Sequence, residues 1–331
     1  MSSSVLHVIL GTGPSGLSIL DALKARNDKL ASDQKTRIRT VNRSGKVKED
    51  VPADVEVMKG NVTDANDVAR VVEGARVVYA AVNAPNYHKW PVEFPPLQTA
   101  ILEGCVKAAV PRLVVLDNLY AYGPHQGRTI TETMPHKATD DRGVTRVKLA
   151  SQLKEYHNAG KIKIIVARAS DFFGPRVLQS QAGDRFMYPI IGGSSVQFLG
   201  DPDQPHAITY IGDLGRAMVT LAFAPDSAYG EDYIVPSHNT SFRALAEAVA
   251  KEAGTKANIS SVKKGFLRTT FVGLLSVFVP PVRGIEGLSY QFDEAFTVDT
   301  AKYVNLFGDD DRTPLEAAVN DAVAWYKAHA Q

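Results

Sequence analysis

Three glycines near the start of the sequence have the spacing of a phosphate-binding loop. Gly11, Gly13 and Gly16 form the pattern GxGxxG directly after the apolar run LHVIL and directly before a stretch whose leucines recur at helical spacing. The first glycine permits a tight turn, the second lets the backbone approach a pyrophosphate, and the third lets helix and strand pack closely. This context predicts a dinucleotide-binding βα unit. The residues expected to line its loop are Gly11, Thr12, Gly13, Pro14, Ser15 and Gly16.

The end of the second predicted strand, TRIRTVNRS, indicates which dinucleotide is bound. It carries Asn42, Arg43 and Ser44, with Lys46 close behind. An Asp or Glu there would bind the ribose hydroxyls of NAD, whereas a guanidinium offers a planar fork of donors to a 2′-phosphate. We therefore predict NADP(H) as the cofactor, held in part by these four residues. A solvated basic turn is the alternative interpretation.

Later strands are expected to end beside the same cofactor. Asn61 and Val62 follow the third strand and could border the adenine, while Ala80, Ala81 and Val82 end the fourth and offer small side chains. Both assignments rest on position, since ligands of open α/β sheets lie beyond the carboxyl ends of the strands.

Strand and helix patterns alternate along the front half of the chain. Such alternation predicts an α/β fold, a doubly wound parallel sheet of the Rossmann type, because parallel strands need crossover connections. We expect residues 1–175 to form the dinucleotide-binding domain, with 206–236 returning to its sheet. Residues 176–205 and 237–331 are expected to form a smaller, mostly helical substrate lobe.

Several later segments, taken in order, resemble a known family. They are LVVLDNLYAYGP, VKLASQ, VARASDFFGPRV, ITYIGDLGRAM and EDYIVPS. Their order is similar to that of the short-chain dehydrogenase/reductase superfamily, in the extended and atypical branch that includes the NAD(P)-dependent epimerases and dehydratases. The resemblance runs nearly end to end and implies a Rossmann fold with a nicotinamide cofactor.

The resemblance breaks at the residues that do the chemistry. The family places a proton-donating tyrosine four residues before a lysine that binds the nicotinamide ribose. Lys148 matches that lysine, but the tyrosine position is Val144, and none of the twelve tyrosines has a lysine four residues after it. The family's catalytic Ser or Thr falls on Asn118, whose amide can polarise a carbonyl but cannot relay a proton as a hydroxyl does.

Other side chains could replace the missing acid. Tyr120 follows the fifth strand at the expected nicotinamide edge, and His88 lies in the loop after the fourth and titrates near neutrality. Together with Lys148 and Asn118, these are the catalytic candidates. The residues expected to line the substrate pocket are Tyr87, Tyr122, Phe173, Phe186, Met187 and Tyr290.

The composition of the chain limits the classes of molecule that it is expected to bind. A formal charge of +1 disfavours nucleic acid and acidic membranes, and the apolar run Phe271–Val279 is shorter than a membrane span, so we interpret it as core or pocket wall. The single cysteine, Cys105, indicates a reducing, cytoplasmic setting, and no Cys/His cluster predicts a metal site. The N-terminal apolar run is expected to be a strand, not a signal peptide. We expect a small-molecule substrate and a monomer or homodimer.

Three functions fit these residues. The first is an NADP(H)-dependent oxidoreductase, a reductase or dehydrogenase of a small, fairly apolar carbonyl or enone compound, working without the usual tyrosine acid. The second is a non-redox isomerase, cyclase or epimerase that uses bound NADP(H). The third is a catalytically inactive regulator that senses NADP(H).

Overall fold

The chain divides into two compact units that interleave along the sequence. The computed structural model describes residues 5–262, 285–309 and 311–330. The first unit takes the chain up to Asp117, then Thr145–Arg168 and Leu214–Tyr233; the second takes Asn118–Val144, Ala169–Asp213 and the chain from Ile234 onward. The apolar run Phe271–Val279 lies outside the described residues.

A seven-stranded sheet forms the centre of the first unit, in the order β10-β6-β5-β4-β1-β2-β3. β1 lies inside the sheet, where it pairs in parallel with β2 and β4, and all five of its residues are buried. A strand with helices on both faces is buried on both sides and therefore mostly apolar, which is why LHVIL, apart from His7, shows no alternation. The strands are β1 (Leu6–Leu10), β2 (Arg37–Asn42), β3 (Val55–Lys59), β4 (Ala75–Ala80), β5 (Arg112–Asp117), β6 (Lys163–Arg168) and β10 (Asp232–Ile234).

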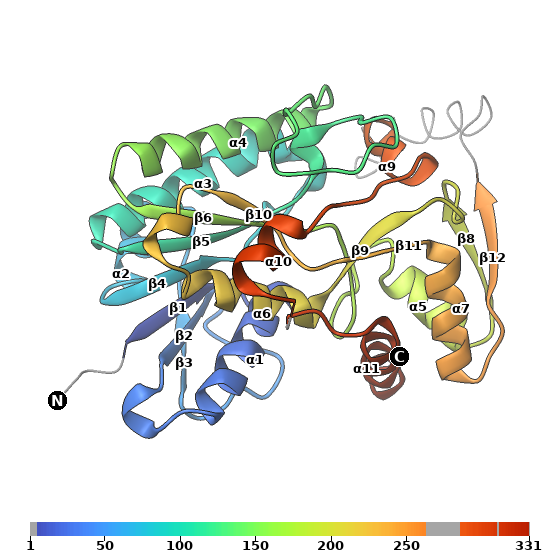
Figure 1. Ribbon diagram of the computed structural model, residues 1–331. Helices are drawn as coiled ribbons and strands as arrows, with labels where there is room; N and C mark the ends of the chain where they lie inside the picture. Colours follow the sequence, from blue (N-terminus) through green and yellow to red (C-terminus); the bar gives the residue numbers. More distant parts are fainter. Residues whose placement is uncertain (1–4, 263–284, 310, 331) are drawn as a thin grey trace. The chain divides into compact units, whose positions relative to one another are not determined.

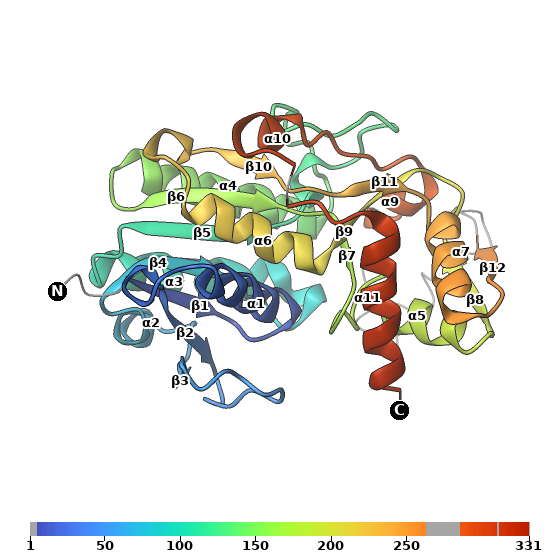
Figure 2. The same ribbon diagram turned by 60° about the horizontal axis from the view of Figure 1, so that its bottom comes forward.

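Helices cover both faces of this sheet. Figure 1 shows α3 and α4 on one face and α1 and α6 on the other, and Figure 2 shows the second face turned forward. Gln98 ties α3 to α4, since its amide donates to the carbonyl of Leu149 and to the side chain of Gln152. The helices are α1 (Pro14–Asp28), α2 (Ala65–Val71), α3 (Trp90–Lys107), α4 (Asp141–Asn158) and α6 (Ile211–Ala222), with short 3-10 turns at Ser32–Gln34, Tyr87–Lys89 and Asp226–Ala228.

The second unit combines two small sheets with helices. One sheet has the order β11-β9-β7 and the other pairs β12 with β8, while α5, α7 and α11 pack against one another. Its strands are β7 (Asp171–Phe173), β8 (Ser195–Leu199), β9 (His206–Tyr210), β11 (His238–Thr240) and β12 (Asn258–Val262). Its helices are α5 (Asp184–Ile191), α7 (Phe242–Ala253), α9 (Tyr290–Asp293), α10 (Ala301–Phe307) and α11 (Leu315–Ala328), with 3-10 turns at Tyr120–Tyr122 and Ile285–Leu288.

The predicted α/β Rossmann architecture is confirmed, and the N-terminal apolar run is a strand as expected. Two details differ from prediction. The segment HAITY does not return to the large sheet: β9 pairs with β7 and β11, and only β10 joins β6. The second unit is neither smaller nor mostly helical, because residues 118–144, 169–175 and 206–213 belong to it and supply two of its strands.

No described helix is both long and apolar enough to cross a membrane.

Candidate functional site

The glycine loop joins β1 to α1, and its three glycines differ in what surrounds them. Gly11 has a φ of +106°, and a Cβ there would lie 2.7 Å from the carbonyl oxygen of Ala81. A Cβ on Gly16 would lie 2.0 Å from the oxygen of Gly11. These two glycines are therefore required by the packing of the protein itself.

Gly13 is different, because no described atom lies within 4 Å of the Cβ it lacks. It is the N-cap of α1 with extended backbone, φ −77°, and Pro14 begins the helix without a side-chain cap. The free N–H groups of the first helical turn suit an anion, and a bare second glycine leaves room for one. The loop fits a pyrophosphate.

The turn after β2 is built around Asn42. Its amide donates to Thr12 Oγ1 and to the carbonyl of Lys46, both at 2.8 Å. Its oxygen accepts from the backbone N–H groups of Ser44 and Gly45 at 3.0 and 2.7 Å. Asn42 thus shapes the turn and ties it to the glycine loop, while Arg43 and Lys46 are left exposed.

A cavity of about 680 Å³ lies against this turn, between the ends of β2 and β3. Arg43 and Lys59 line it, together with the paired Asp67 and Arg70. The N–H of Asn61 and then Arg70 hold the pKa of the Asp67 carboxyl below its usual value, so that carboxylate is charged and neutralised by its partner. With Asp67 and Arg70 paired, the remaining charges of the lining are those of Arg43 and Lys59, and both are positive, which favours binding of a phosphate group.

The remaining residues predicted to contact the cofactor lie around the same edge. Asn61 lines the cavity, although its side-chain oxygen accepts from both the N–H and the hydroxyl of Thr63. Val62 is half-buried. Ala81 and Val82 abut the glycine loop, since their atoms are the nearest neighbours of a Cβ placed on Gly11.

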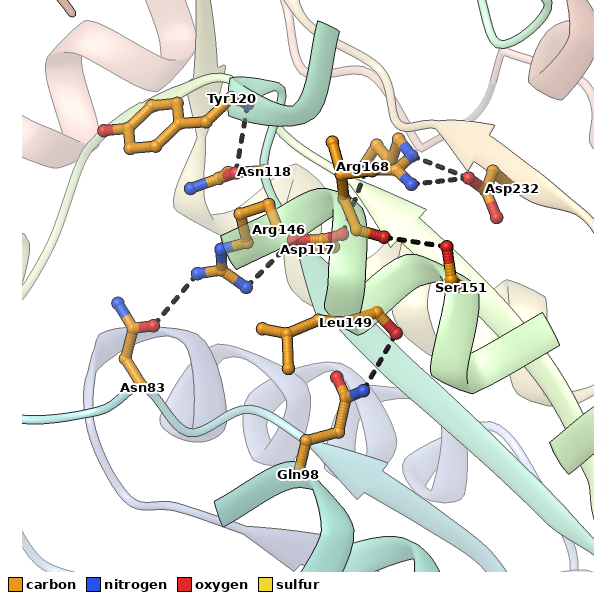
Figure 3. A network of polar contacts seen from close by, with 11 residues as sticks. Asn83, Gln98, Asp117, Asn118, Tyr120, Arg146, Leu149, Ser151, Arg168 and Asp232 are labelled. Carbon is orange, nitrogen blue, oxygen red and sulfur yellow. Dashed lines mark hydrogen bonds and ion pairs between the residues drawn. The ribbon is translucent and has the colours of Figure 1, made fainter. Parts of the chain in front are cut away.

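A buried charged network lies at the carboxyl ends of β5 and β6 (Figure 3). Asp117 accepts from Arg146 at 2.9 Å through one oxygen and from Arg168 at 2.9 Å through the other. Arg168 is fully buried and also pairs with Asp232 at 2.6 Å. Arg146 reaches the oxygen of Asn83 at 3.0 Å, in the loop after β4. Two cations balance two carboxylates, which is the condition for burying them.

Aromatic rings hold Arg146 in place. Its guanidinium carbon lies 4.5 Å from the ring centre of Trp90 and 4.3 Å from that of Phe94, both on α3. The indole of Trp90 donates to the carbonyl of Ala84, so the same ring also fixes the loop after β4. Arg146 therefore joins α4, α3, β5 and that loop inside the first unit.

The predicted catalytic residues do not all belong to one unit. Lys148 and His88 belong to the first, and Asn118 and Tyr120 to the second. Lys148 is exposed one turn after Val144 on α4, and His88 is half-buried on the 3-10 turn before α3. The oxygen of Asn118 accepts the N–H of Tyr120 at 3.1 Å, which directs the amide oxygen into its own loop (Figure 3).

Most residues predicted to line the substrate pocket are packed inside the second unit. Phe173, Phe186 and Met187 are at most 1% exposed. Tyr122 is equally buried and lies edge-on to His136, and Tyr290 lies edge-on to His125. In the first unit, Tyr87 is half-buried against Trp90.

A family model describes more than half of the chain. The model of the NAD dependent epimerase/dehydratase family matches residues 11–235, from the first glycine of the loop to just after β10. The chain belongs to this family. The resemblance to the extended short-chain dehydrogenases/reductases is thereby confirmed.

Individual relatives are distant. Among curated proteins, an uncharacterized UDP-glucose epimerase, YtcB of Bacillus subtilis, is 23% identical over 176 residues, which are 51% of this chain and 55% of that protein. The match thus spans about half the length of the curated relative.

Solved structures of an epimerase and a dehydratase share the fold over nearly the whole chain. UDP-glucuronic acid 4-epimerase from Bacillus cereus, in complex with NAD, is 16% identical with a TM-score of 0.76, covering 99% of this chain and 100% of its own. The dTDP-glucose 4,6-dehydratase DesIV from Streptomyces venezuelae is 16% identical with a TM-score of 0.74, covering 98% and 97%. At these identities the likeness shows the fold alone.

The buried network of Asp117, Arg146 and Arg168 was not predicted from the sequence. Asp117 ends the apolar run VVLD and Arg168 ends IIVAR, so each places a charge at the end of a buried strand. Such charges are rarely buried unless paired, which is a signal that partners exist. Arg146 gave no comparable signal, because charged residues are ordinary on a helix.

Proposed function

We propose that this chain is an enzyme that binds NADP(H) at the carboxyl edge of the seven-stranded sheet and catalyses a redox-neutral reaction of the epimerase or isomerase type. The bound nicotinamide would supply a hydride acceptor that returns the hydride, as NAD-dependent family membership favours. The observation that carries the cofactor choice is the end of β2. It presents Arg43 to a positively lined cavity where an NAD-binding protein would place a carboxylate.

The chain's own residues would divide the binding. Gly13 and the first turn of α1 would accept the pyrophosphate, and Arg43, Ser44 and Lys46 the 2′-phosphate. Asn42 would hold the phosphate-binding turn against Thr12 instead of contacting the ligand, since both ends of its amide are already bonded.

The chemistry requires a group that holds a proton. Val144 cannot do so, which leaves Tyr120 and His88 as the residues that could exchange a proton with a substrate hydroxyl. Lys148 would contribute positive charge, and the NH₂ of Asn118 could donate to a carbonyl oxygen.

Val144 favours a second candidate, net reduction of a small, fairly apolar enone or aldehyde. Hydride addition to an enone leaves an enolate, whose charge a lysine or an amide can stabilise without a strong acid. Such a reaction would tolerate the loss of the tyrosine. It differs from the first in consuming one NADPH for each product formed. A chain that binds NADPH without converting any substrate would instead be a sensing regulator.

The test begins with binding. Calorimetry with NADPH and NADH should show tighter binding of NADPH by at least about tenfold, equivalent to about 1.4 kcal/mol. Arg43→Ala should remove most of that preference while leaving NADH binding within about twofold. Arg37→Ala, an exposed arginine at the other end of the same strand, is the matched control and should change neither.

Turnover then separates the reactions. With NADP⁺ supplied as the hydride acceptor, incubation with UDP-glucose or UDP-glucuronic acid should yield product without net formation of NADPH. A panel of apolar enones and aldehydes incubated with NADPH should leave the NADPH absorbance unchanged. Stoichiometric loss of NADPH would support the reductase instead. Equal affinity for NADH, or an unchanged preference in Arg43→Ala, would overturn the cofactor assignment.

A further inference from the structure

A second cavity lies at the amino-terminal ends of the strands of the first unit's sheet. It has a volume of about 290 Å³ and is lined where β1, β4 and β5 begin, by the turn before β2 and by the end of α6. In a parallel sheet all the amino ends lie at one edge and all the carboxyl ends at the other. This cavity is therefore at the end of the strands opposite the glycine loop, and its lining shares no residue with the loop.

The lining carries an excess of positive charge. Arg26, Lys35, Arg76 and Arg112 contribute cations, and Asp33 is the carboxylate among the lining residues. The side chains of Arg26 and Arg76 form no hydrogen bond or ion pair with any residue that the structure describes, although the Arg26 guanidinium lies over the ring of Phe223. Each can offer its fork of donors to an anion.

Arg112 is committed and supports the cavity wall. It donates to the carbonyl oxygen of Ala222 at 3.3 Å and to Asp226 at 2.8 Å. Lys163 binds the other oxygen of Asp226, and together the two cations hold the pKa of that carboxyl below its usual value. The carboxylate that pairs with Arg112 is thus already neutralised.

One wall of the cavity is an aromatic ring. Phe223 is 43% exposed, which is unusual for a large apolar side chain, and the guanidinium carbon of Arg26 lies 3.9 Å from its ring centre. The ring of His7 stacks on Phe223 at 5.2 Å, and His7 bonds the hydroxyl of Tyr79 at 2.9 Å. Val5, 46% exposed, adds a second apolar surface.

His7 does not contribute a further charge. Burial, and then the neighbouring Arg26 and Arg112, lower the pKa of this imidazole to about 3. His7 therefore lines the cavity as a neutral ring, and the positive charge of the lining comes from the arginines and Lys35.

We propose that this cavity is a second ligand site, which takes a small anion, a carboxylate or phosphate group carried on a single apolar ring. Arg26 and Arg76 bind the anionic group, and the ring packs on Phe223 and Val5. The volume suits a ligand of one ring, since drug-sized pockets begin near about 300 Å³. The site is independent of the proposed NADP(H) function, because it shares no residue with the glycine loop or the turn after β2.

The test uses phenyl phosphate, benzoate and inorganic phosphate as probes, titrated into the full chain by calorimetry. Because a phosphate ester could also bind near Arg43, every titration is repeated in Arg43→Ala. Phenyl phosphate or benzoate should bind Arg43→Ala at least about tenfold more tightly than inorganic phosphate, and whichever binds better identifies the anionic group.

Three variants locate the site. In the Arg43→Ala background, Arg26→Gln and Arg76→Gln should each weaken binding by at least about fivefold, and Phe223→Ser should remove the advantage of the ring-bearing probe over inorganic phosphate. Circular dichroism establishes that each variant is folded, and Arg185→Gln, an exposed arginine on α5 of the second unit, is the matched control. Binding that survives both glutamine variants, equal affinity for all three probes, or no binding with a Kd below about 1 mM, equivalent to about −4 kcal/mol, would overturn the proposal.

Discussion

At the scale of single residues, the loop glycines separate protein packing from ligand binding. Position 16 requires glycine because a side chain there would overlap the carbonyl oxygen of Gly11. Around Gly13, by contrast, the described residues leave room for a methyl group. If the loop holds a pyrophosphate, position 13 lacks a side chain so that the ligand can approach the backbone. The same sequence pattern thus contains two different physical requirements, which mutation can distinguish.

Gly13→Ala should leave the protein folded and weaken dinucleotide binding. The backbone of Gly13 suits alanine, and losing a glycine N-cap costs about 1 kcal/mol or less. The added methyl group would occupy the approach of the pyrophosphate, so we expect the Kd for NADPH to rise at least about tenfold in calorimetry.

Gly16→Ala is the counterpart, with the opposite expectation. Its Cβ would overlap the Gly11 oxygen, and relief of that overlap should cost about 3 kcal/mol or more in urea unfolding. A stable Gly13→Ala variant with unchanged NADPH affinity would show that this loop is a structural turn.

At the scale of elements, buried charge joins α4 to β5, β6 and β10. Asp117 accepts hydrogen bonds from Arg146 on α4 and from Arg168 on β6. The bond between Arg146 and Asn83 extends the network to the loop after β4. Removing one partner of a buried pair leaves an uncompensated charge, which is far more costly than replacing both with apolar groups.

Asp117→Leu should therefore destabilise the protein by about 3–5 kcal/mol, because Arg146 and Arg168 would lose the carboxylate they share. Adding Arg146→Met should recover part of this loss, giving a coupling energy of about 1–3 kcal/mol in urea unfolding. The exposed pair Lys24–Asp54 is the control, since Asp54→Leu should cost less than about 1 kcal/mol. Additive effects of Asp117→Leu and Arg146→Met would contradict the network.

Local patterns were enough to predict most of these elements, but not their neighbours. The inner strands β1, β4 and β5 are short, mostly apolar runs, β2 and β3 alternate apolar with polar residues, and the glycine loop can be recognised from its spacing. β9 was assigned to the wrong sheet because a fully buried five-residue run looks the same in any sheet. Its pairing with β7 and β11 depends on the whole fold.

The same limit applies to the site. The turn at Asn42–Lys46 could be predicted because its residues are adjacent in sequence. Asp117, Arg146 and Arg168 come together only when β5, β6 and α4 are neighbours. Phe186 and Met187 were predicted to line the substrate pocket, but an apolar side chain suits pocket and core equally, and both are buried inside the second unit.

At the scale of the whole molecule, buried histidines make stability depend on acidity. Burial lowers the pKa of His125 and His238, and burial together with two arginines lowers that of His7 to about 3. Each of these side chains is held neutral in the folded protein, so protons bind the unfolded chain first as the pH falls.

The pKa of His7 is lowered furthest, which fixes the direction in which stability changes with pH. Its unfolded pKa is near 6.5 and its folded pKa about 3, so stability is retained above pH 6.5 and lost as the pH falls through that interval, by about 1.4 kcal/mol per pH unit. His7→Gln should reduce the slope of unfolding free energy against pH between pH 6 and 4 by up to that amount. Tyr79→Phe removes the hydrogen bond to His7 but keeps the imidazole, so it should lower stability while preserving the slope. Urea unfolding at half-unit pH steps measures both, and a slope that is the same in His7→Gln and the unaltered protein would show that His7 is protonated in the folded state.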